Sequence, residues 1–117
     1  MKKIYYLKTC STCIRILKEL NAGPEVEIQD IKTKSITELQ LESLKDMAGT
    51  YEALFSKKAM KYRKWNLHEK ELSEDDYKFY ILEDYTFLKR PVIVNQSEVF
   101  VGNSKQVVAL AKISLNG

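Results

Sequence analysis

The sequence contains little of what marks several large classes of protein. Two cysteines in 117 residues are too few for a disulfide framework. With a single histidine, His68, they supply at most half of a conventional zinc ligand set, which argues against a metal site. No apolar run approaches the ~20 residues that span a bilayer, and the first residues do not resemble a signal peptide. We therefore expect a cytoplasmic protein that does not bind membranes.

The bulk composition is that of an ordinary globular chain. Its length corresponds to one domain, and 44% of the residues are hydrophobic while 30% are charged. The net charge of +3 is small, whereas nucleic-acid binding usually requires a concentrated basic stripe. No direct nucleic-acid binding is expected.

The two cysteines lie three residues apart, in Cys10-Ser11-Thr12-Cys13. The strand-like residues 4–7 precede them and the helix-like residues 14–20 follow. A helix start presents unpaired N–H groups and the positive end of the helix dipole, and nearby Lys8 and Arg15 add positive charge. A Cys10 thiolate is favoured there, and only the thiolate is a good nucleophile. The spacing brings Cys13 within reach of a disulfide, although a buried Cys13 that serves only the core is the alternative.

The hydrophobic pattern along the chain predicts an order of elements. Strand, helix and strand over residues 4–7, 13–20 and 25–31 form a βαβ unit. Helical segments are expected between residues 33 and 88, with capping residues at 35–38 and 73–76. A hairpin of residues 92–94 and 99–101 follows, and then an amphipathic helix whose apolar side chains are Val107, Val108, Leu110 and Ile113.

That order, with CxxC at the first strand-to-helix turn and Arg90-Pro91 opening the third strand, resembles the thioredoxin-like arrangement. The helical insert, the run 90–94 and the turn 101–103 are similar to the arsenate reductase family, which includes ArsC enzymes and Spx-type regulators. The resemblance implies a single α/β domain, residues 1–117, with a mixed four-stranded sheet. Its core would be residues 1–32 and 89–117, and its helical insert residues 33–88.

The same resemblance implies particular site residues. Family reductases use one cysteine, matched by Cys10, and three arginines that bind the oxyanion. Arg90 matches one of them, but the insert arginine falls on Ser56, beside Lys57 and Lys58, and no arginine follows the last hairpin. Arsenate reduction is therefore not expected. The resemblance also implies a cis Pro91 that faces the thiols and leaves backbone groups free to pair with a substrate peptide.

The first hypothesis is a thiol–disulfide oxidoreductase with no bound cofactor. Cys10 attacks, Cys13 resolves the mixed disulfide, and Arg90 stabilises the thiolate or binds an anion. Ser11 and Thr12 cap the helix and offer hydroxyls, while backbone N–H groups hold the developing charge. Glutathione, glutaredoxin or thioredoxin would supply electrons. In a one-cysteine variant, Cys10 forms a mixed disulfide with glutathione and Cys13 takes no part.

Two further hypotheses remain. An Spx-like regulator would use the same disulfide as a switch and bind RNA polymerase around Gly49, and a family member without chemistry would be a binding module. The densest positive charge is either a solvated helix face or an anion or acidic-partner site beside the thiols. Because acidic residues follow closely, part of it should pair internally. Its members are Lys57, Lys58, Lys61, Arg63 and Lys64.

Overall fold

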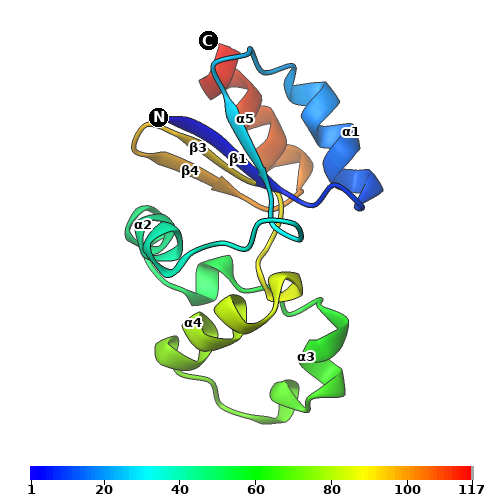
Figure 1. The fold of residues 1–117 in the computed structure, drawn as a ribbon, viewed down its shortest axis with the longest axis vertical. Coiled ribbons are helices and arrows are strands. Elements are labelled where there is room, and N and C mark those ends of the chain that lie inside the picture. Colours follow the sequence, from blue (N-terminus) through cyan, green and yellow to red (C-terminus); the bar gives the residue numbers. More distant parts are fainter. Residues whose placement is uncertain (117) are drawn as a thin grey trace. The chain divides into compact units, whose positions relative to one another are not determined.

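The computed structural model describes residues 1–116 and contains helices and strands in the predicted order (Figure 1). The chain divides into two compact units. The first comprises Met1–Lys34 and Arg90–Gly117, and the second comprises Ser35–Lys89. Each unit is described by itself below.

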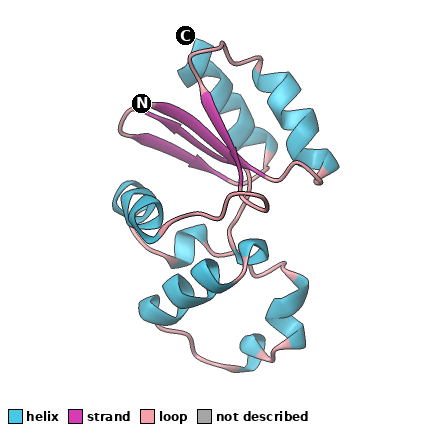
Figure 2. Cartoon of the chain, viewed as in Figure 1, coloured by secondary structure: helices cyan, strands magenta, loops and turns pink. Residues whose placement is uncertain are grey.

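A mixed four-stranded sheet forms the centre of the first unit (Figure 2). Its order is β2 (Glu27–Asp30), β1 (Lys2–Tyr6), β3 (Val92–Asn95) and β4 (Glu98–Val101). β1 pairs with β2 in parallel, whereas the pairs β1–β3 and β3–β4 are antiparallel. Ile4 lies between Ile28 and Ile93 in the register. The predicted α/β class with a βαβ–ββα sheet is confirmed.

Two helices, α1 (Ser11–Leu20) and α5 (Lys105–Asn116), lie side by side against the sheet (Figure 1). α1 buries Cys13, Ile16 and Leu20, which recur at helical spacing as the sequence predicted. α5 buries a different stripe from the one predicted, made of Val108, Ala111 and Leu115.

The predicted apolar face of α5 is confirmed at Val108, which is 3% exposed, but wrong at Leu110 and Ile113, which are 50% and 68% exposed. The buried face of α5 is formed by Val108, Ala111 and Leu115, which are spaced by three and four residues. Ala111 in the middle of this face is fully buried. A small alanine is a weaker hydrophobic signal than the exposed leucine and isoleucine, so the pattern pointed to the wrong side of the helix.

The burial of β2 differs from the alternation of its sequence. Val26 and Ile28 alternate with polar residues, a pattern that predicts a buried face containing Ile28. In the structure Ile28 is 55% exposed, whereas Gln29 is 4% exposed. The Gln29 amide donates to the carbonyl oxygen of Lys34 at 3.0 Å, which satisfies part of its hydrogen-bonding capacity within the unit. β2 is an edge strand, and its buried face carries the polar side chain of Gln29, which the hydrogen bond to Lys34 stabilises.

The second unit is helical, and two of its helices begin with capping boxes. α2 (Glu38–Ala48) starts at Thr37, and α4 (Glu74–Glu83) starts at Ser73. In both, the first hydroxyl accepts a backbone N–H three residues on, and that residue's side chain accepts in return. The remaining elements are short: η1 (Glu52–Leu54), α3 (Met60–Lys64), η2 (Leu67–Glu69) and η3 (Tyr85–Phe87).

An aromatic cluster holds the second unit together. Phe55 stacks on Phe87 with ring centroids 5.2 Å apart, and Tyr77 lies 4.9 Å from Phe55. Tyr62 contacts Phe55, and Trp65 and Tyr80 contact Phe87. These aromatic side chains therefore pack against one another within the helical unit.

Backbone hydrogen bonds join the middle of the helical unit to its last residues. The N–H of Ser56 donates to Phe87 at 2.7 Å, and that of Lys89 donates to Leu54 at 2.8 Å. These two hydrogen bonds accompany a single antiparallel bridge between Phe55 and Leu88. Of the helices formed by residues 1–116, none has the length and apolar character required to cross a membrane.

Candidate redox site

Cys10 occupies the residue immediately before the first turn of α1. Its backbone is extended (φ −95°, ψ 114°), and its carbonyl accepts the N–H of Ile14 at 3.1 Å. The N–H of Cys10 donates to Leu7 at 3.0 Å, which fixes the turn between β1 and α1. The helix start has no side-chain oxygen cap. The expectation that Ser11 and Thr12 cap α1 is wrong, because both residues lie inside the first turn.

The environment of Cys10 favours its thiolate. Partial burial by itself would raise the pKa of Cys10, but the backbone N–H and the thiol of Cys13, the backbone N–H of Thr12 and the charge of Arg90 together outweigh it. The pKa of Cys10 therefore lies below its ordinary value. The donors are those that a helix start leaves unpaired.

Cys13 is affected in the opposite direction. The pKa of Cys13 is raised to about 11, and burial of its side chain is the largest cause. The negative charge of Cys10 and the hydrogen bond to Cys10 act in the same direction, whereas a hydrogen bond from the backbone of Leu7 and the charge of Arg90 lower it. Both cysteines are free thiols. One thiol is thus poised to ionise and the other holds its proton.

Arg90 and Pro91 also belong to the first unit. The Arg90–Pro91 bond is cis, as the family resemblance implied. Pro91 is buried, and its carbonyl accepts the N–H of Gly102 at 2.9 Å. Arg90 is half-buried, and its charge lowers the pKa of both thiols. Of the cations considered from the sequence, Arg90 acts on the pKa of Cys10, whereas Lys8 and Arg15 are not among its causes.

Three of the expected site residues lie in the second unit. Lys57 is exposed and pairs with Glu52 at 3.1 Å. Lys58 is exposed as well. Gly49 ends α2 at φ 100°, a conformation that favours glycine, so the fold by itself accounts for a glycine there. The proposed roles of all three remain predictions.

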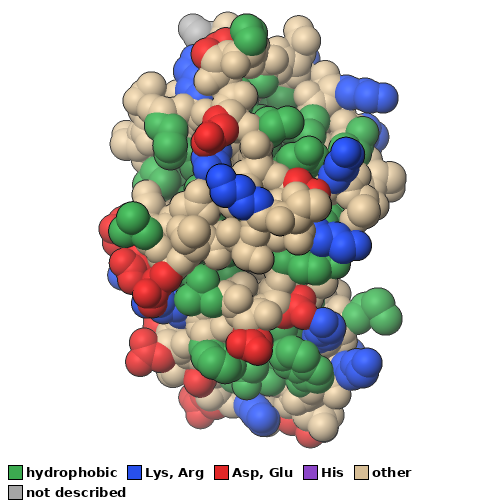
Figure 3. Space-filling model, viewed as in Figure 1, with side chains coloured by type: hydrophobic (Ala, Val, Ile, Leu, Met, Phe, Trp, Pro, Cys, Tyr) green, Lys and Arg blue, Asp and Glu red, His purple; other side chains and the backbone are tan. Residues whose placement is uncertain are grey.

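The basic cluster around α3 is partly neutralised within its own unit. Besides the pair formed by Lys57, Lys61 forms an ion pair with Asp84 and lies over the ring of Trp65. The internal pairing expected from the sequence is confirmed, but its carboxylates are Glu52 and Asp84, not those of the acidic run at 69–76. On the face shown in Figure 3, basic and acidic side chains both occur over this unit, with apolar ones between them.

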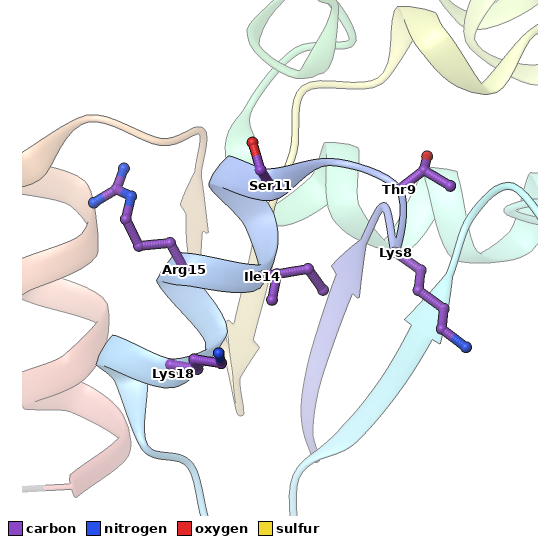
Figure 4. Close-up of a pocket in the computed structure, with 6 residues that line it drawn as sticks. All are labelled: Lys8, Thr9, Ser11, Ile14, Arg15 and Lys18. Carbon is purple, nitrogen blue, oxygen red and sulfur yellow. The ribbon is translucent and has the colours of Figure 1, made fainter.

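An open pocket of ≈ 520 Å³ lies beside the cysteine-bearing turn. Thr9 and Ser11, the two neighbours of Cys10, both line it (Figure 4). The pocket was not predicted from the sequence. Helical spacing nevertheless places residues 11, 14, 15 and 18 on one face of α1, next to the face that buries Cys13, Ile16 and Leu20. The lining residues are Lys8, Thr9, Ser11, Ile14, Arg15 and Lys18.

Known proteins resemble this chain in sequence and in fold. A model of the ArsC family matches residues 5–110, whereas no curated protein sequence matches the chain. The arsenate reductase from Vibrio cholerae has a similar structure, with a TM-score of 0.77, 24% identity, and coverage of 92% of this chain and 95% of that one.

Two further solved structures show the same architecture. A Staphylococcus aureus protein is 26% identical, with a TM-score of 0.71 and coverage of 92% of this chain and 94% of its own. An arsenate reductase (ArsC) related protein from Brucella melitensis is 20% identical, with a TM-score of 0.71 and coverage of 90% and 88%. The descriptions of the solved structures concern those proteins, and their likeness supports the fold. Among residues 1–116, no group of three or more His, Cys, Asp or Glu side chains is placed to hold a metal ion.

Proposed function

Because the chain belongs to the ArsC family, we propose that it is a thiol–disulfide oxidoreductase with Cys10 as nucleophile and Cys13 as resolving thiol. The observation that carries this proposal is the opposite displacement of the two pKa values. That of Cys10 is lowered by backbone donors and Arg90 against its burial, and that of Cys13 is raised to about 11 by burial. The attacking group must be a thiolate, whereas the resolving group acts one step later.

The reaction proceeds in two balanced exchanges. The Cys10 thiolate attacks one sulfur of a disulfide R–S–S–R, forms Cys10–S–S–R and releases one RS⁻. Cys13 then gives up its proton, attacks the Cys10 sulfur and releases the second RS⁻. The substrate gains two electrons, and the protein is left with a Cys10–Cys13 disulfide.

The charge of Cys10 couples the two exchanges. Two of the causes that raise the pKa of Cys13 are the charge of Cys10 and the hydrogen bond to it. Both disappear when the Cys10 sulfur enters a mixed disulfide, so Cys13 becomes easier to ionise at the step that requires it. Burial continues to raise its pKa, which makes resolution slower than attack.

The other expected residues have supporting roles in this proposal. Arg90 stabilises the Cys10 thiolate by its charge, and backbone N–H groups of Thr12 and Cys13 hold that charge in place. Cis Pro91 lies between Arg90 and β3, but its carbonyl accepts the N–H of Gly102 and proline has no N–H, so Pro91 itself offers no backbone group to a substrate peptide. Glutathione, glutaredoxin or thioredoxin in the cytoplasm returns the disulfide to the dithiol, and no bound cofactor takes part.

A pair of variants tests the mechanism. Wild-type protein, Cys10→Ser and Cys13→Ser are each mixed with oxidised glutathione, and the adducts are identified by mass spectrometry. We expect an intramolecular disulfide in the wild type, a stable glutathione adduct on Cys13→Ser, and no reaction in Cys10→Ser. If Cys10→Ser reacts as fast as the wild type, or if the thiol pKa of Cys10 is near its ordinary value, the proposal is wrong.

Arsenate reduction itself is not proposed. Of the three arginines that the family resemblance implies for the oxyanion, this chain has Arg90, with Ser56 at the second position and none after the hairpin. In an assay with glutathione and glutaredoxin, we expect little or no arsenate turnover. Rapid turnover would show that another group replaces the two arginines.

The alternative is an Spx-like regulator in which the disulfide is a switch and the surface around Gly49 binds RNA polymerase. The exposure of Gly49 and the open space around its Cα favour this second candidate. A polymerase pull-down with Gly49→Arg tests it. Gly102→Arg is a matched control because Gly102 has a similar φ of +97° and similarly open surroundings. Selective loss with Gly49→Arg supports the regulator, and no binding by the wild type rejects it.

A further inference from the structure

We propose that Lys8, Arg15 and Lys18 form an anion-binding pocket that selects small, negatively charged disulfides as partners of Cys10. This inference rests on the proposed thiol–disulfide exchange and adds to it the residues that determine specificity. They are different from the arginine positions that the family resemblance implies for an oxyanion.

The first support is the position of the pocket. Thr9 and Ser11 both line it, and Cys10 is the residue between them. Neighbouring Cα atoms are about 3.8 Å apart, so a molecule in the pocket lies next to the backbone that carries the reactive sulfur. In Figure 4, the loop supplies Lys8 and Thr9, and α1 supplies the other lining residues.

The second support is the charge of the lining. Three of its six residues are cationic and none is acidic. Arg15 has a weak partner in Glu19, at 4.0 Å on the exposed surface. Asp30 accepts the backbone N–H of Lys8 at 3.3 Å and also binds the Thr33 hydroxyl, so its carboxylate is directed to backbone and hydroxyl donors. Among the ion pairs of residues 1–116, none involves the ammonium group of Lys8 or Lys18.

The third support is that these charges have no evident part in activating Cys10. The cation that lowers the pKa of Cys10 is Arg90, whereas Lys8, Arg15 and Lys18 are not among the causes. All three are exposed at the pocket. Because these side chains are exposed at the pocket, their positive charge can reach a ligand there.

The size and chemistry of the pocket fit a peptide-sized ligand with carboxylates. A volume of ≈ 520 Å³ lies in the ordinary range of small-molecule sites. Lysine and arginine bind carboxylates through charge-assisted hydrogen bonds, the hydroxyls of Thr9 and Ser11 add neutral donors, and Ile14 extends toward the loop (Figure 4). Held there, an anionic disulfide places one sulfur near Cys10 for the attack described above, with departure of the other half as a thiolate.

Two small disulfides of opposite charge test the proposal. The rate of Cys10 modification is measured with oxidised glutathione, which is anionic, and with cystamine, which is cationic, for the wild type and the triple variant Lys8→Gln/Arg15→Gln/Lys18→Gln. We expect the glutathione rate to fall about tenfold or more in the variant, because local charge raises encounter rates by such factors. The cystamine rate should stay equal or rise. Added salt should slow the wild-type reaction with oxidised glutathione and leave that of the triple variant nearly unchanged.

The control is Lys105→Gln/Lys112→Gln, which removes two exposed lysines of α5 in the same unit. It should preserve the ratio of the two rates. The thiol pKa of Cys10 is measured in every variant, so that an altered nucleophile is separated from altered recognition. A disulfide-bonded acidic protein serves as a third substrate.

The outcomes separate the two proposals. If the wild type reacts with no disulfide, the proposed function fails. If it reacts but the ratio of rates is the same in wild type and triple variant, exchange stands and the anion pocket is rejected. If the triple variant loses rate only with the protein substrate, the pocket is rejected as a small-molecule site. If it loses rate equally with oxidised glutathione and cystamine, Lys8, Arg15 and Lys18 have a structural role and do not select by charge.

Discussion

The start of α1 differs from the starts of the other long helices in how its N–H groups are satisfied. α2 begins with Thr37, whose hydroxyl accepts a backbone N–H at 3.1 Å, and α4 begins with Ser73, whose hydroxyl accepts one at 3.2 Å. Ser104 does the same before α5, at 3.2 Å. At α1 the corresponding residue is Cys10, and no side-chain oxygen caps the helix.

This difference separates helix starts that are stabilised by an oxygen cap from one at which we propose thiol chemistry. An oxygen cap contributes about 1 kcal/mol, whereas a neutral thiol is a weak acceptor. A thiolate, in contrast, is a charged acceptor that gains from every unpaired donor at the helix start. At α1 the oxygen cap is replaced by a thiol whose pKa is lowered, which is what the proposed nucleophile requires.

Among the substitutions at helix starts, removing an oxygen cap should have the largest effect on stability. Thr37→Ala and Ser73→Ala should each lower the free energy of unfolding by about 1 kcal/mol, because each leaves helix N–H groups without an acceptor. Urea unfolding followed by circular dichroism measures it. The control is Ser97→Ala, at an exposed turn residue, which should change stability by less than about 0.5 kcal/mol. Equal effects at all three sites would remove the distinction between capped and uncapped ends.

Alkaline pH should reveal the second thiol of the pair. Folding raises the pKa of Cys13 from 9.0 to about 11, so between these values the unfolded chain has lost a proton that the folded chain retains. Stability then falls as pH rises, by at most about 1.4 kcal/mol per pH unit. Cys13→Ala should show a shallower decline than the wild type in urea unfolding from pH 8.5 to 10.5 under reducing conditions. Parallel declines would contradict the raised pKa.

Cys10→Ser should make the protein more stable while abolishing its reactivity. A serine in the same extended conformation can accept the N–H groups that the thiol uses poorly, with an expected gain of about 0.5–1 kcal/mol. Unfolding below the pH at which thiolate absorbance of Cys10 appears gives the cleanest comparison. Cys10→Ala, which supplies no acceptor, is the matched control, and a serine variant no more stable than it would mean that the helix start cannot be capped by oxygen.

The smallest expected effect concerns Arg90. Its charge is the last in order of the causes that lower the pKa of Cys10, so Arg90→Gln should raise that pKa part of the way toward its ordinary value. Arg15→Gln should leave the Cys10 pKa unchanged, because Arg15 is not among its causes. Thiolate absorbance as a function of pH measures both. A larger shift with Arg15→Gln would show that the charge on α1 governs the thiol.

The sequence was sufficient for the order of elements and for the position of Cys10 at the start of the first helix. Strand and helix periods differ clearly around residues 4–20, and the segment Ser73–Asp76 places a capping hydroxyl and its return carboxylate at the required spacing. Cys10 was identified because its position relative to a strand and a helix determines which donors surround it. Those properties are local, and local patterns are what a sequence displays directly.

The errors concern properties that depend on neighbours distant in the chain. Ile28 is exposed and Gln29 is buried, opposite to the expectation. β2 is an edge strand, and which of its faces is buried depends on the elements packed against it. The inner face of α5 was misassigned because small Ala111 is buried. Arg90, not Arg15, acts on the Cys10 thiol because the fold brings residues 10 and 90 together. The pocket beside Cys10 was missed since a cavity requires the loop and the helix to be placed in space.

The backbone N–H of Leu7 provides the protein with an internal reporter of its oxidation state. It donates to the sulfur of Cys13, while the Leu7 carbonyl accepts the N–H of Cys10, so one peptide segment at the end of β1 touches both cysteines. Formation of the Cys10–Cys13 disulfide changes the charge and position of its sulfur acceptor. The amide resonance of Leu7 should therefore report, without any added probe, how much of the protein is oxidised in a mixture.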